Sequence, residues 1–175
     1  MANQTTERER VRGYLLSQGK RYDYFEIWSR CVRARLEVLD SLQGVSDDQA
    51  RFRPADGEWS VNEVALHVLN GSRRVARLVE LLAEGQPASS DRIDPPHEET
   101  NLTVEVLHSQ LLRDTVMWSA LTERLPDSPS FDATTLHPFF GELHSRAWYL
   151  FQRIHDLDHY RQIEAIKETQ GYPSG

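Results

Sequence analysis

Apolar residues recur every three or four positions through four long segments of the chain, which is the spacing of a helix with one buried face. A fifth and shorter segment, about Thr5 to Ser17, has the same pattern. No alternating run of Val, Ile and Thr is present, so no strand is predicted. The four long helices are predicted from about Arg21 to Gln43, from Ser60 to before Gly85, from near Thr103 to before Pro126, and from near His144 to before Gly171.

Four amphipathic helices of similar length predict an all-α fold, a four-helix bundle with an additional short N-terminal helix. We expect residues 1–20 to form the N-terminal helical extension and residues 21–175 to form a single domain. The segments between the long helices are longer than a minimal bundle needs. Connections of this length could cross the bundle from one end to the other, so their length does not fix the topology.

Charge and cysteine content narrow the functional classes. The formal net charge is −7, which argues against a general nucleic-acid binder because such a protein needs a basic face. The lone Cys31 excludes an internal disulfide framework and is expected to pack in the core. No segment has the roughly 18 to 20 apolar residues of a membrane span, and no apolar signal segment is apparent. We therefore expect a cytoplasmic protein without membrane partners.

Histidines supply the candidate chemistry. His155 and His159 are four residues apart, so they differ by about 40° around a helix and about 6 Å along it. Both imidazoles can then reach one metal ion, and His67 on the second helix is a candidate third ligand. Three protein ligands would leave a coordination position open, as in catalytic sites. By spacing alone, such a pair is more often incidental, and a histidine like His67 is more often a core residue.

Charged residues also fall within the apolar stripes: Arg35, Asp114 and Asp158. Buried charges need partners, so we expect Asp158 to pair with Arg35 or with the N–H of a ligand histidine. Asp158 or Asp114 is a candidate catalytic general base. The alternative is that these charges are exposed at the ends of the bundle. His137 is expected near the mouth of the bundle and His144 at the start of the last helix.

Two segments, EWSVNEVALHVLN and HPFFGELHSRAWYLFQRIHDLDHYRQI, resemble the signature regions of the DinB/YfiT-like superfamily. The first contains the pair Trp59 and Ser60, followed by His67. The second contains His155 and His159, followed by a Gln-Ile pair. Family members often have histidine just before the second ligand of this helix, whereas this chain has aspartate there.

The resemblance implies a four-helix bundle that binds a divalent metal, most often zinc or nickel, through His67, His155 and His159. It also implies a homodimer and a small-molecule substrate, with a low-molecular-weight thiol as the first candidate. The implied function is a thiol S-transferase that uses a metal-activated thiol. Two alternatives stay open: a metal-dependent hydrolase that uses metal-bound water, and a non-catalytic, metal-stabilised dimeric module that binds a ligand.

Overall fold

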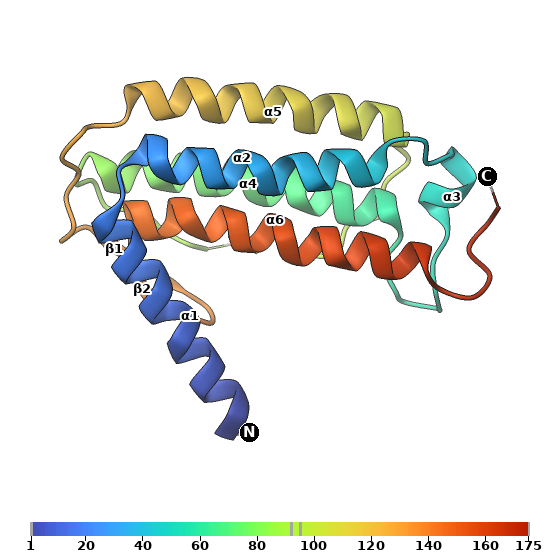
Figure 1. The fold of residues 1–175 in the computed structure, drawn as a ribbon, viewed down its shortest axis with the longest axis horizontal. Coiled ribbons are helices and arrows are strands. Elements are labelled where there is room, and N and C mark those ends of the chain that lie inside the picture. Colours follow the sequence, from blue (N-terminus) through green and yellow to red (C-terminus); the bar gives the residue numbers. More distant parts are fainter. Residues whose placement is uncertain (1, 92, 95, 175) are drawn as a thin grey trace.

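The computed structural model describes residues 2–91, 93–94 and 96–174. Within them, four long helices lie side by side along the long axis of the molecule (Figure 1). Both α2 and α4 contact α5 and α6, so the four helices stand at the corners of a square. The predicted four-helix bundle is confirmed, and its helix limits agree with the sequence to within a few residues. The bounds are α2 (Tyr24–Leu42), α4 (Val61–Ala83), α5 (Val104–Arg124) and α6 (Ser145–Lys167).

Each long helix begins where a side chain can cap it. The side chain before the helix accepts a hydrogen bond from the backbone N–H three residues later, which satisfies one of the unpaired donors of the first turn. At α4, Ser60 and Glu63 form a reciprocal capping pair. At α6, Nδ1 of His144 accepts from the Ala147 N–H at 3.3 Å, as expected for a helix start. Asp23 and Thr103 cap the other two helices.

The chain crosses the bundle between α4 and α5. These helices run in the same direction (Figure 1), so the connection between them must return along the length of α4. Contacts follow this path: Ile93 packs into the core, His97 stacks on Trp59, and Glu99 pairs with Arg53. The crossover loop therefore passes the part of α4 that contains His67.

Two elements were not predicted. The expectation of no strand was wrong, because β1 (Thr134–His137) and β2 (Gly141–His144) form an antiparallel hairpin. Strands of four residues are too short for alternation to be visible in the sequence. The short helix α3 (Asp47–Arg51), capped by Ser46, was also missed. Among the described helices, none combines the length and the apolar composition needed to cross a bilayer.

The N-terminal helix α1 (Ala2–Arg21) is longer than expected, and its first half projects from the bundle (Figure 1). Its last turns contact α6 and β2. Gly19 permits this contact, because a Cβ there would lie 2.8 Å from Cε1 of His144 and 2.9 Å from the backbone N of Ala147. Leu15 is fully buried in the core of the chain itself, so it is not an exposed contact for a second subunit.

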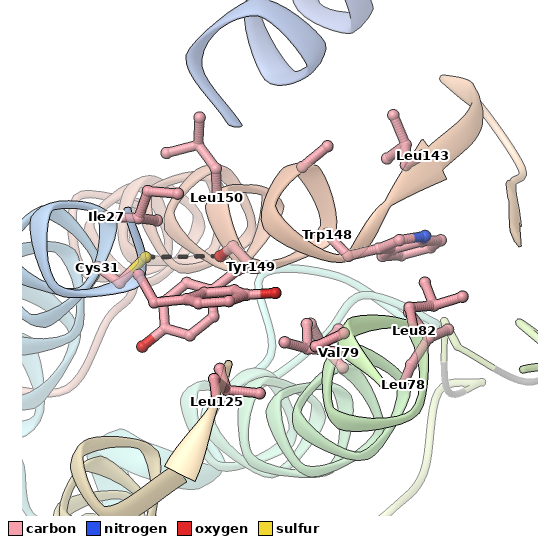
Figure 2. Close-up of a cluster of buried hydrophobic side chains, with 14 of the residues drawn as sticks. Ile27, Cys31, Leu78, Val79, Leu82, Leu125, Leu143, Trp148, Tyr149 and Leu150 are labelled. Atoms are coloured by element: carbon pink, nitrogen blue, oxygen red, sulfur yellow. Dashed lines mark hydrogen bonds between the residues drawn. The ribbon is translucent and has the colours of Figure 1, made fainter. Parts of the chain in front are cut away.

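The interior has two apolar clusters, one toward each end of the bundle. Figure 2 shows part of the cluster near α1, where Cys31 and Ile27 of α2 face Tyr149 and Leu150 of α6. The Cys31 thiol donates to the backbone oxygen of Tyr149 at 3.5 Å. Burial raises the pKa of this thiol far above its ordinary value. Cys31 therefore packs in the core, as expected, and is not a thiolate nucleophile.

Candidate metal centre

Histidines from two helices meet on one side of the bundle. His67 lies in the second turn of α4, and His155 and His159 lie one turn apart on α6. The Nε2 atoms of His67 and His155 are 3.3 Å apart, and one ligand atom from each histidine lies within 4.8 Å of the other two. Metal–nitrogen bonds of about 2.1 Å place ligands on one ion up to roughly 4 Å apart, so small ring rotations suffice. The three predicted ligands meet and can hold one metal ion.

The local environment suits a cation. His67 is buried and the other two histidines are partly buried. Burial, followed by the proximity of His155, lowers the pKa of His159 to about 4, so its ring is neutral at pH 7. Nδ1 of His159 lies 2.8 Å from Oε1 of Gln162, which can only accept. This contact places the proton on Nδ1 and leaves Nε2 as the ligand atom, an arrangement that is typical of metal-binding histidines.

His155 has a different environment. Its Nδ1 is buried, and within the described chain it has no hydrogen-bond partner. Oδ1 of Asp156 lies 3.9 Å away, which is beyond hydrogen-bond distance. This oxygen instead accepts from Nε2 of Gln152 at 2.7 Å.

Asp156 belongs to a buried polar layer at the middle of the bundle. Nε of Arg35 donates to Oδ2 of Asp156 at 2.9 Å, and Nη1 of Arg35 donates to Oδ2 of Asp114, also at 2.9 Å. Nη2 of Arg35 contacts the Ser72 hydroxyl at 3.0 Å, and Trp118 donates to that hydroxyl at 2.8 Å. Burial alone would raise the pKa of Asp156, but the Arg35 charge holds that pKa below its ordinary value.

The predicted pairing of Asp158 with Arg35 was wrong. The Asp158 side chain is 62% exposed, and its Oδ1 accepts from Arg161 at 3.0 Å. Asp156 is the inward acid of α6, and a step of two residues turns the helix by about 200°. The buried side of α6 includes Gln152, Asp156 and Ile163. Two of these residues are polar, so the spacing of apolar residues alone did not include Asp156 among the inward positions. The sequence feature that could have identified Asp156 as an inward residue is its spacing of four residues from Gln152 and seven residues from Ile163.

A cavity of about 420 Å³ lies beside the three histidines, which line it. It lies between α4, α6, the hairpin and the crossover loop. Asp94 of that loop has Oδ1 3.5 Å from Nε2 of His67, a proximity that the sequence did not predict because a crossover creates it. Asp158 also lines the cavity. The other lining residues are Trp59, Gly71, Val75, Ile93, His137, Pro138, Phe139, Phe140, Phe151, Ile154 and Gln162.

The two candidate catalytic acids therefore occupy different places. Asp158 stands at the exposed edge of the cavity. Asp114 is not among the residues that line it, and its carboxylate contacts Arg35 and Ser72 in the buried layer. A proton-transfer role for either acid remains a prediction. His137, expected near the mouth of the bundle, does line the cavity, with its ring 4.5 Å from that of Phe151.

Comparison with known proteins places the fold in a family. The model of the DinB superfamily matches residues 30–163, which is most of the chain and includes all three histidines. The chain belongs to the DinB superfamily. This DinB-superfamily protein is 26% identical over 159 residues to the uncharacterized protein YuaE of Bacillus subtilis (strain 168), an alignment that covers 77% of this chain and 93% of YuaE.

Two solved structures are similar in fold. The four-helix bundle protein TT2238 has a TM-score of 0.62 at 22% identity, over 81% of this chain and 98% of TT2238. The DinB-like protein YjoA of Bacillus subtilis has a TM-score of 0.60 at 19% identity, over 85% of this chain and 94% of YjoA. At these identities the likeness supports the fold alone.

Proposed function

We propose that this protein is a metal-dependent enzyme that holds zinc or nickel on His67, His155 and His159 and transfers a low-molecular-weight thiol to a small electrophile. One observation carries the proposal: three imidazoles from two helices converge beside an open cavity. A structural zinc site usually has four protein ligands, whereas a set of three leaves a position for an exchangeable ligand. Imidazole ligands suit both zinc and nickel.

The residues of the chain have separate tasks in this proposal. A bound divalent cation would favour ionisation of a thiol at the open position. Gln162 orients His159, and the apolar cavity wall limits the access of water to the reacting groups. Asp94, whose carboxylate lies 3.5 Å from Nε2 of His67, can accept the proton that the thiol releases. Asp158 at the cavity edge is the second candidate acceptor, as its place in the sequence suggested.

Metal analysis tests the first half of the proposal. Purified protein loaded with zinc or nickel and desalted should retain about one equivalent. Single changes of His67, His155 and His159 to Ala should abolish this retention. His108→Ala is the control, because His108 is on α5 and outside the three-histidine group. Equal metal retention in the control and in the three variants would refute a site at these histidines.

Activity with thiols tests the second half. A thiol such as 2-mercaptoethanol and the electrophile 1-chloro-2,4-dinitrobenzene form a coloured thioether. Its formation should be accelerated by the metal-loaded protein and not by the His155→Ala variant. Hydrolysis of 4-nitrophenyl acetate without thiol would instead favour the hydrolase alternative. Stoichiometric metal with neither reaction would favour the non-catalytic ligand-binding module.

We also propose that the protein is a homodimer. Apart from the resemblance, the support is a set of exposed apolar side chains on α5: Leu112, Val116 and Met117. Large exposed apolar patches are typical of interaction sites. Light scattering should give about twice the 20.2 kDa of one chain. A mass of one chain at all working concentrations would contradict this proposal.

A further inference from the structure

The cavity beside the histidines has an aromatic wall. The ring of Phe151 lies 5.8 Å from that of His155, which joins the wall to the metal centre. Phe140 stacks on His137 at 4.6 Å and lies 6.2 Å from Phe151. Phe139 of the hairpin also lines the cavity, and it is 52% exposed. An apolar group in the cavity would therefore meet rings from its entrance to the centre.

The charged residues that line this cavity are both acidic. Its charged lining residues are Asp94 and Asp158, and no Lys or Arg occurs among the lining residues that the structure describes. Arg161 lies beside the cavity edge, where it pairs with Asp158 and partly neutralises it. Asp94 is 63% exposed and lies close to His67. Inside the cavity an anionic group would therefore meet a carboxylate and no lining cation. At the entrance, the Arg8 guanidinium lies 5.1 Å from the centre of the Phe139 ring.

We propose that the molecule that occupies this cavity is uncharged or cationic and places an aromatic or branched alkyl group against Phe139, Phe140 and Phe151. This inference rests on the proposed function and names the substrate class of the same site. The volume of about 420 Å³ is within the range of small-molecule sites. Molecules with a carboxylate or phosphate on the part that lies along Phe140 and Phe151 are excluded from the substrate class.

A metal ion on the three histidines would change this preference for uncharged or cationic molecules only at the end of the cavity beside the histidines. A thiolate or another anionic donor at the open coordination position would be attracted to the metal. A second negative charge further along the cavity would be screened from the metal by the intervening ligand and solvent, and it would meet Asp94 or Asp158. The proposal therefore favours substrates with an apolar body over polyanionic ones.

Three probes with one skeleton test the proposal: 4-phenylbutanol, 4-phenylbutylamine and 4-phenylbutyrate. Their dissociation constants are measured by NMR titration of metal-free protein at low ionic strength, so that no metal charge contributes. The alcohol and the amine should bind about tenfold more tightly than the carboxylate, as expected for one unpaired repulsion near a protein surface. Asp94→Asn should reduce this difference. Equal or tighter binding of the carboxylate, or no binding of any probe, would overturn the proposal.

Matched variants locate the binding. Phe139→Ser should weaken binding of the alcohol about tenfold, because it removes one ring of the wall. Phe25→Ser is the control, since Phe25 on α2 is similarly exposed at 57% and does not line the cavity. Both rings are exposed, so neither change should disturb folding, and circular dichroism checks this. Unchanged affinity in Phe139→Ser would count against the aromatic wall as the binding surface.

Zinc titration of the same preparations separates this inference from the proposed function. Preference for the carboxylate, together with zinc binding that depends on the histidines, would overturn the substrate class and leave the metal enzyme intact. Preference for the alcohol without zinc binding would leave an apolar binding cavity and refute the metal enzyme.

Discussion

Arg35 and Asp156 form a two-point ion pair in the middle of the bundle, with Nε to Oδ2 at 2.9 Å and Nη2 to Oδ1 at 3.2 Å. Their side chains are only 4% and 1% exposed. Ser72 and Asp114 complete the layer, so each of the four long helices contributes one member. The layer separates the two apolar clusters. A shift of one helix by a turn would leave a buried charge unpaired, so this layer favours a single alignment of the helices.

Asp156→Asn is expected to lower the free energy of unfolding by about 3 kcal/mol, because Arg35 loses one of its two buried counter-charges. Asp158→Asn is the matched control and should change that energy by less than about 0.5 kcal/mol, since its pair with Arg161 is exposed. Urea denaturation of metal-free protein measures both. Equal losses in the two single variants would contradict the assignment of Asp156 as the inward acid.

Gln162→Leu is expected to weaken metal binding by about 10- to 100-fold, because it removes the acceptor that orients His159. Gln162→Glu retains an acceptor at this position and should retain most of the affinity. Competition with a chromogenic zinc chelator measures both dissociation constants. Circular dichroism of the metal-free proteins should show no difference, which would separate ligand orientation from a loss of folding. Wild-type affinity in Gln162→Leu would mean that this contact does not support the site.

Gly19→Ala should release the docked end of α1, because the new Cβ would lie within 3 Å of both His144 and the backbone of Ala147. Gly13→Ala is the control on the same helix, since a Cβ there meets nothing within 4 Å. Alanine favours helix over glycine by about 1 kcal/mol, so the control should be neutral or stabilising. Hydrogen exchange of the amides in α1 should be faster in the first variant only. Equal exchange in both would show that the close approach is not needed.

Stability should fall in mild acid. Burial lowers the pKa of His137 and of His144 to about 4, whereas an unfolded histidine titrates near about 6.5. The unfolded chain therefore binds more protons between these two values, and the free energy of unfolding decreases as the pH falls from about 6.5 to 4. The loss should be about 3 kcal/mol for each residue.

His144→Asn removes one titrating group and retains a side chain that can cap α6. Urea denaturation with EDTA at pH 7.5, 6 and 5 should therefore show a smaller pH dependence in this variant than in the wild type. The chelator prevents metal release from contributing to the result. An unchanged slope would show that His144 does not remain neutral in the folded protein.

The sequence was sufficient to predict the four long helices and the N-terminal helix. It also predicted that two of the three candidate ligands share one face of a helix. The spacing of apolar residues is a local property, and the caps at Ser60 and His144 are local contacts. The positions of His155 and His159 follow from helix geometry alone. His67 was a candidate third ligand from its place on the second helix, and the family resemblance implied that it meets the other two. Spacing within one helix carries no information on which face of another helix it meets.

Tertiary structure decided which charges are buried and what surrounds the candidate metal centre. Asp156, rather than Asp158, faces inward, because Arg35 on α2 and its partners on α4 and α5 offset the cost of burying a carboxylate there. Asp94 reaches His67 because the loop between two parallel helices returns along α4. The hairpin adds the aromatic wall. Contacts between residues far apart in the sequence determine all of these features, and such contacts cannot be inferred from the local spacing of apolar residues.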